Sequence, residues 1–81
     1  MSGVSRNVHE IANGMILSDP EILAGTPVFK GTRVPVKVLF EYLADGLSLN
    51  YFLETFPSVK RVRATAVLRY RQTRIEQEIA A

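Results

Sequence analysis

Hydrophobic and polar positions alternate with the period of an α-helix through the second half of the chain. Apolar side chains recur there at i, i+3, i+4 and i+7, the spacing that gathers them on one helix face. Two short helices show this pattern, the first through Val36, Leu39, Phe40 and Leu43 and the second through Leu49, Phe52, Leu53 and Phe56. We expect Asp45-Gly46 to end the first helix, Ser48 to cap the second and Pro57-Ser58 to end it. A third helix, without a breaker, is predicted over residues 60–81.

The first third of the chain has β-type patterning between turn signals. Met15-Ile16-Leu17 is a short strand candidate that ends at Ser18-Asp19-Pro20, because Asp before Pro favours a turn. Val28-Phe29 and Arg33-Val34 are β-prone segments separated by Lys30-Gly31-Thr32. These segments predict a small hairpin that must pack on the helices to be stable.

Together these elements predict a mainly α fold with a small N-terminal β-hairpin. The order of helix, short turn, short helix, short turn and long helix is that of a trihelical helix-turn-helix domain. A plain three-helix bundle without a DNA role has the same layout. We divide the chain into a flexible N-terminal arm (1–14), the hairpin with the helix-turn-helix domain (15–70), and a continuation of the last helix as a C-terminal tail (71–81).

The length of 81 residues leaves room for one small domain. A chain of this size buries only about 60% of its unfolded surface. It has no cysteine and one histidine, so neither disulfides nor zinc are expected to stabilise it. We therefore expect a homodimer, with Val28-Phe29 and Met15-Leu17 paired across a two-fold axis and with added contacts from Leu68 and Ile75.

Positive charge is concentrated in the last third of the chain. The net charge is +2, but residues 57–81 contain six basic and two acidic residues, whereas residues 1–56 contain four basic and six acidic ones. A helix with a net charge of +4 is expected of an element that binds a polyanion, although a solvated helix face can have the same composition.

The third helix, unrolled at 100° per residue from Lys60, shows two apolar stripes. One stripe contains Ala64, Leu68, Ile75 and Ile79, and the other contains Val59, Val62, Ala66 and Tyr70. A basic ridge of Lys60, Arg63, Arg71 and Arg74 lies between them. One stripe can pack on the two shorter helices and leave the other for a partner. The candidate partner or dimer contacts are Val62, Leu68, Tyr70, Ile75 and Ile79.

The start of the last helix carries the candidate DNA-binding residues. In a helix-turn-helix unit, this part of the last helix faces base edges while neighbouring cations hold phosphates. The candidates are Lys60, Arg61, Arg63 and Arg69. Three neutralised phosphates per protomer predict a log–log salt slope of about −3, or about −5 to −6 for a dimer. The alternative is a protein-interaction module in which one apolar stripe binds a partner and the basic ridge meets only water.

Catalysis and metal binding are not expected from this sequence. His9 stands alone in the N-terminal arm without a second histidine or a cysteine, and Glu41 with Asp45 on one helix face is typical of a solvated surface. No Walker or dinucleotide motif is present, so we expect a protein that is not an enzyme and needs no cofactor. The chain has no signal peptide and no apolar run of about 20 residues, so we expect a cytoplasmic protein without membrane association.

A compact motif lies between Ser18 and Val36. It consists of Asp19-Pro20, then Gly25-Thr26-Pro27, then Gly31-Thr32-Arg33-Val34-Pro35-Val36. With the Leu-rich helix, Asp45-Gly46, Phe56-Pro57, Leu68 and Tyr70, it resembles the domain of unknown function 433 family over about residues 15–70. The resemblance implies structural roles for Asp19, Pro20, Gly25, Pro27, Gly31, Thr32, Arg33 and Pro35.

Members of that family are described as predicted VapB-like antitoxins, which are small homeodomain-like helix-turn-helix proteins often encoded beside a PIN-like ribonuclease toxin. The resemblance implies an antitoxin of a type II pair that binds its toxin through the N-terminal arm or the C-terminal tail and represses its own operon by binding operator DNA. Two positions depart from the family pattern. Ala24 replaces the first glycine, which is harmless if its φ is negative, and Val62-Arg63 replaces an acidic pair, which favours DNA contact.

Overall fold

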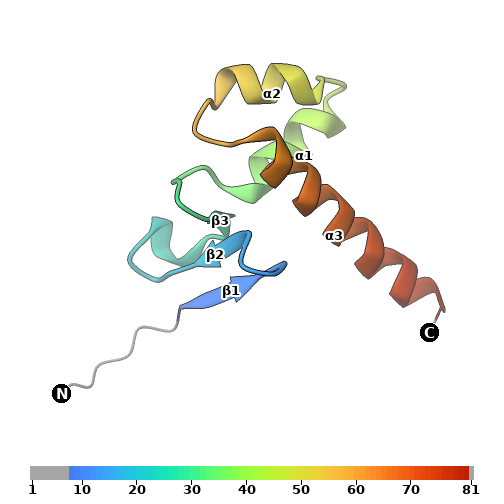
Figure 1. Ribbon diagram of the computed structural model, residues 1–81, viewed down its shortest axis with the longest axis horizontal. Helices are drawn as coiled ribbons and strands as arrows, with labels where there is room; N and C mark the ends of the chain where they lie inside the picture. The colour runs from blue at the N-terminus through green and yellow to red at the C-terminus, as the bar shows by residue number, and fades with distance from the viewer. Residues whose placement is uncertain (1–7, 81) are drawn as a thin grey trace.

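The computed structural model describes residues 8–80, which form three helices and a small antiparallel sheet (Figure 1). The strands are β1 (His9–Ile11), β2 (Ile16–Ser18) and β3 (Val28–Phe29), in the spatial order β1-β2-β3. The helices are α1 (Val36–Ala44), α2 (Leu49–Thr55) and α3 (Arg61–Ala80), and a short 3-10 turn, η1, covers Leu23–Gly25. The predicted fold class of three helices with a small β part is therefore confirmed.

Local signals in the sequence set the ends of the helices. The Ser48 hydroxyl accepts a hydrogen bond at 3.0 Å from the backbone N–H of Tyr51 and so caps α2. Gly46, with φ +83°, follows α1 in the left-handed conformation. The N–H groups of Gly46 and Leu47 donate to the carbonyls of Leu43 and Tyr42 at 3.0 and 2.9 Å, which is the Schellman ending of a helix. The predicted bounds of all three helices agree with the structure to within one or two residues.

The sheet is not the hairpin that the sequence predicts. β2 pairs with β1 on one side and with β3 on the other, so the two strand candidates meet within one chain and not across a two-fold axis. The second predicted arm, Arg33-Val34, is not a strand. Its contacts to β3 are a hydrogen bond of 3.0 Å from the Phe29 N–H to the Val34 carbonyl and an isolated bridge at Pro35. A second hydrogen bond, of 2.9 Å from the Val36 N–H to the Pro27 carbonyl, completes this bridge, and the pairing ends there because α1 begins at Val36.

The predicted N-terminal arm (1–14) is wrong for residues 9–11, which form β1. Residues 1–7 lie outside the described part of the chain. A loop joins β1 to β2, and in it Ala12, Asn13 and Gly14 have φ values of +57°, +58° and +83°. Asn-Gly between two β-prone segments is a strong hairpin signal, and it is the sequence feature from which this hairpin could have been found.

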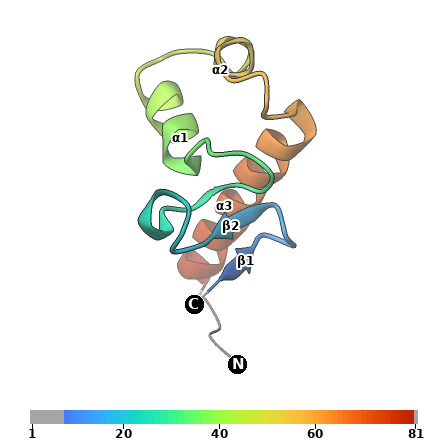
Figure 2. The ribbon, with the colours of Figure 1, turned by 90° about the vertical axis from the view of Figure 1, so that its left-hand side faces the viewer.

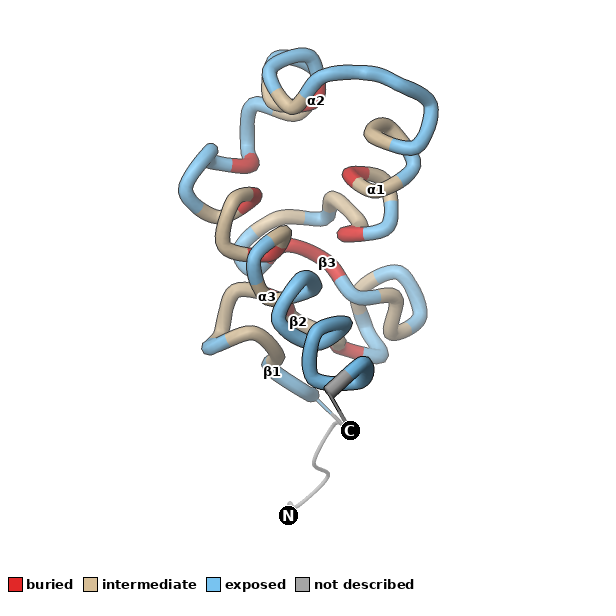
Figure 3. Tube along the Cα trace, turned by 90° about the vertical axis from the view of Figure 1, so that its right-hand side faces the viewer, coloured by how far each residue is buried: buried red, intermediate tan, exposed pale blue. Residues whose placement is uncertain are grey.

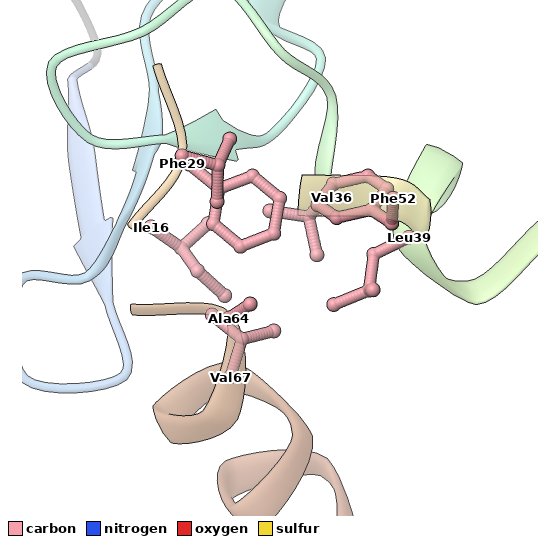
Figure 4. Close-up of a cluster of buried hydrophobic side chains, with 8 residues drawn as sticks. Ile16, Phe29, Val36, Leu39, Phe52, Ala64 and Val67 are labelled. Carbon is pink, nitrogen blue, oxygen red and sulfur yellow. The ribbon is translucent and has the colours of Figure 1, made fainter. Parts of the chain in front are cut away.

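One hydrophobic core joins the sheet to all three helices (Figure 4). Its buried residues are Ile16, Phe29, Val36, Leu39, Phe52, Val59, Ala64 and Val67. The rings of Phe29 from β3 and Phe52 from α2 have centroids 6.0 Å apart, so the sheet and the shortest helix meet directly in this core. In Figures 1 and 2, α2 lies at the end of the molecule opposite β1 and the last turns of α3, and the sheet lies beside α3. A sheet this small is stabilised by these helix contacts.

Ala24 adopts a backbone conformation that L-residues rarely occupy. Its φ and ψ are +55° and +33°, between Leu23 at φ +48° and Gly25 at φ +89°. Alanine would be harmless at this position only with a negative φ, and this condition is not met. A left-handed conformation costs a residue with a Cβ about 1–2 kcal/mol, so the replacement of the family glycine introduces strain.

Ala24→Gly is expected to raise the free energy of unfolding by about 0.5–1 kcal/mol, because the relief of strain exceeds the added entropy of glycine in the unfolded chain. Ala66→Gly is the matched control, since Ala66 lies within α3. It should lower the free energy of unfolding by about 1 kcal/mol. Urea unfolding followed by circular dichroism measures both changes. A loss of stability in Ala24→Gly would show that the turn does not hold Ala24 at positive φ.

Candidate functional site

The first half of α3 has a single buried side. Within residues 61–79 the buried side chains are Ala64 and Val67, and Val67 is only 1% exposed. On the helical wheel that starts at Lys60, Val67 falls at about 340°, inside the predicted basic ridge. The predicted basic ridge is therefore interrupted by a buried residue, although Lys60, Arg71 and Arg74 are exposed. Val67 belonged to neither stripe, and its burial determines how the helix is rotated.

The opposite side of α3 is accessible over its first two turns. Arg61, Val62, Thr65, Ala66 and Arg69 line one shallow depression there, which we call the outward face. Both arginines are exposed, and Val62 has 65% of its surface exposed. These residues lie on one side because they are spaced one, three and four positions apart along a helix, away from Ala64 and Val67.

A hydrogen bond and a short turn connect α2 to the start of α3. Arg61 donates a hydrogen bond to the side-chain oxygen of Asn50 near the start of α2. The turn between the helices is closed by a hydrogen bond of 3.0 Å from the Val59 N–H to the Phe56 carbonyl, and the Val59 side chain is buried. α2 and the first turn of α3 therefore form one structural unit.

Aromatic side chains fasten α2 to α1. The ring centroid of Tyr42 lies 5.6 Å from that of Phe52 and 5.7 Å from that of Phe56, and the rings of Phe52 and Phe56 are 5.1 Å apart. Edge-to-face and tilted arrangements at these distances are favourable. Because α1 holds α2 in this way, the start of α3 that follows α2 is also fixed in direction.

The four predicted DNA-binding residues separate into two pairs. Arg61 and Arg69 belong to the outward face. Lys60 and Arg63 line a different cavity of about 210 Å³, between the start of α3 and the turn after β3. The residues that line this cavity, which we call the basic pocket, are Phe29, Lys30, Gly31, Thr32, Ser58, Val59, Lys60 and Arg63. Lys30 was not a site candidate, because nothing in a local pattern connects it with residues thirty positions later.

The rest of the predicted ridge has a different environment. The Arg71 guanidinium carbon lies 4.6 Å from the ring centroid of Phe40, so Arg71 makes a cation–π contact with α1. Arg74 is exposed and lines a groove with Ile11 and Ile16 of the sheet. The ridge is therefore not a continuous cationic surface.

The predicted partner contacts on α3 also differ from one another. Leu68 is partly buried and packs against the core, so part of its side chain stabilises the fold. Tyr70 is half-buried and lines the groove beside the sheet. Ile75 and Ile79 remain exposed, Ile79 by 80%. Every residue from 71 to 79 is exposed, as Figure 3 shows for the end of α3.

The motif residues of the first third stabilise turns. The carboxylate of the buried Asp19 accepts a hydrogen bond at 2.9 Å from the Glu21 N–H, the local turn expected of Asp-Pro. The Ser18 hydroxyl donates to the Gly25 carbonyl at 2.6 Å. Thr32 donates through its hydroxyl to the Phe29 carbonyl at 2.8 Å and accepts from the Val34 N–H at 3.0 Å. Arg33, Pro20 and Pro27 are exposed, and Pro35 precedes α1.

Comparison with known proteins places this arrangement in a family. A sequence model described as "Protein of unknown function (DUF433)" matches residues 16–70. The chain belongs to this family. The DUF433 match runs from β2 through the first half of α3, so it contains all residues of the outward face and the basic pocket. The exposed end of α3 lies outside it.

One curated relative is similar over most of this chain. It is "Uncharacterized protein y4eO" from Sinorhizobium fredii (strain NBRC 101917 / NGR234), 37% identical over 71 residues. The aligned region is 83% of this chain and 32% of the relative, so the chain spans about a third of the length of that protein. No solved structure matches the chain. Among the described residues, no helix is both long and apolar enough to cross a membrane.

Proposed function

We propose that this DUF433 protein binds DNA through a homeodomain-like helix-turn-helix unit formed by α2, the turn at residues 56–60 and α3. The observation that carries the proposal is the outward face, where exposed Arg61 and Arg69 flank Val62 and Thr65. Arginine can donate two hydrogen bonds to guanine, and small apolar groups can contact the thymine methyl. These are the side-chain types that read base edges in a major groove.

The dimensions of α3 suit this role. Its 20 residues give a length of about 30 Å, and a helix with its side chains is about 10–12 Å wide, close to the major-groove width of about 12 Å. α2 has seven residues, and its Asn50 accepts a hydrogen bond from Arg61 of α3. In a helix-turn-helix unit, the shorter helix crosses the backbone while the following helix enters the groove.

We also propose that the protein is a homodimer. Because β2 and β3 pair with each other within one chain, we assign the dimer contacts to the exposed Ile75 and Ile79 of α3.

A salt titration tests DNA binding and stoichiometry together. Fluorescence anisotropy with DNA from upstream of the protein's own gene should give a log–log slope of about −3 per protomer, or about −5 to −6 for a dimer. Sedimentation of a 9.1 kDa species at micromolar concentration would contradict the dimer, and a salt-independent signal would contradict DNA binding.

We further propose that the protein is the antitoxin of a type II pair, acting in the cytoplasm on a PIN-like ribonuclease toxin and on its own operon. The family resemblance supports this role. Co-expression with a PIN-like ribonuclease encoded beside it should relieve growth arrest and give a complex that co-purifies. If the complex forms while DNA binding is absent, the protein is an interaction module without a DNA role.

A further inference from the structure

The basic pocket brings together cations from segments that are distant in the sequence. Lys30 comes from the turn after β3, whereas Lys60 and Arg63 come from the start of α3. Figures 1 and 2 show this turn, which leads from β3 to α1, beside the loop that leads into α3. Three positive side chains therefore line one cavity, and this cavity is separate from the outward face.

Two of these three cations lack an acidic partner within the described residues. No carboxylate of that part of the chain lies within ion-pair distance of Lys60 or Arg63. Lys30 is paired with Glu10 at 2.6 Å, in a contact where both side chains are about half exposed. Arg63 is itself only partly exposed. A guanidinium that has lost part of its hydration without gaining a counter-ion is a favourable place for an anion.

The pocket also has space and neutral donors for such an anion. Gly31 lines it with φ +83°, and no atom lies within 4 Å of the position that a Cβ would take there. Ser58, a residue with a hydroxyl donor, is also part of the lining. The cavity volume of about 210 Å³ is many times the roughly 10–15 Å³ that one water needs, so a hydrated tetrahedral oxyanion fits.

We infer that the basic pocket binds a phosphate group, held by Arg63, Lys60 and Lys30. In the DNA complex this group is a backbone phosphate next to the segment read by α3, an assignment that rests on the proposed function. Arginine suits phosphate because it can donate two parallel hydrogen bonds, and lysine supplies a point charge. The turn of the family motif thus takes part in ligand binding in addition to shaping the chain.

Neutral variants test this assignment in the full-length protein. Lys30→Gln and Arg63→Gln should each lower DNA affinity about fivefold to tenfold at 0.1 M salt and reduce the log–log salt slope by about 1, for all DNA sequences alike. Lys37→Gln is the matched control, since it removes the same charge from an exposed position on α1 outside the pocket. Glu10→Gln should instead strengthen binding, because it releases Lys30 from its ion pair. Circular dichroism checks that each variant is folded.

The possible results test phosphate binding by the basic pocket separately from the proposed DNA binding. Wild-type binding with an unchanged slope in Lys30→Gln and Arg63→Gln would overturn the pocket and leave DNA binding in place. If the wild type binds no DNA, the proposed function fails, and titration with inorganic phosphate decides the inference. A saturable NMR shift of the Gly31 amide that Arg63→Gln removes would then support a site for free phosphate. The absence of that shift would overturn the site.

Discussion

Arg61→Glu combined with Arg69→Glu is expected to abolish specific DNA binding while the fold stays intact. Both arginines lie exposed on the outward face, so neither substitution disturbs the core. A lost bidentate base contact costs about 1–3 kcal/mol, and each glutamate also repels the phosphates, so affinity should fall by at least about 100-fold. The hydrogen bond from Arg61 to Asn50 is lost as well, but it is exposed and contributes little to stability. Fluorescence anisotropy measures the affinity, and circular dichroism the fold.

A second double variant distinguishes the effect of where the charges are changed from the effect of the change in net charge itself. Lys37→Glu with Arg74→Glu makes the same change in net charge at exposed positions that belong to neither the outward face nor the basic pocket. This variant should keep most of the affinity of the wild type. If the two double variants bind DNA equally well, or lose binding equally, the outward face is not the reading surface.

Phe52→Ala is expected to lower the free energy of unfolding by about 3–5 kcal/mol, because a fully buried ring is removed and a cavity remains. Phe52 is 0% exposed, and its ring contacts Phe29 from β3 at 6.0 Å and Tyr42 from α1 at 5.6 Å between centroids. It therefore connects the sheet and the first two helices. A small domain has a total stability of about 5–15 kcal/mol, so this variant should be marginally folded. Urea unfolding followed by circular dichroism gives the change.

Val62→Ala provides the comparison for the core substitution. Val62 is largely exposed on α3, so its truncation should change the free energy of unfolding by no more than about 0.5 kcal/mol. A small effect of Phe52→Ala, similar to that of Val62→Ala, would mean that α2 does not depend on the shared core. DNA binding in Phe52→Ala should fall with the folded fraction, since Phe52 shares the core with Ala64 and Val67 of α3.

Sequence reasoning was most successful where the decisive interactions are local. Ser48 caps α2 through a contact three residues away, and Gly46 ends α1 through contacts within the same turn. It was least successful for β1, a strand of three residues too short to show a period. Its pairing with β2 depends on the Asn13-Gly14 loop and on burial of Ile16 against residues far along the chain. The strain at Ala24 could not be predicted either, because the positive φ of this residue is visible only in the backbone of the folded chain.

The sequence by itself determined the three helices, the Gly46 end of α1, the Ser48 cap of α2 and the family, because periodicity and turn chemistry act over a few residues. It also determined the angles between side chains around α3, since these follow from helix geometry. Only the tertiary structure decided which side of α3 faces outward, because burial of Ala64 and Val67 sets the rotation of the helix. That rotation leaves Arg61 and Arg69 exposed to solvent. It also brings Arg63 beside Lys30, a proximity created by packing that no local pattern contains.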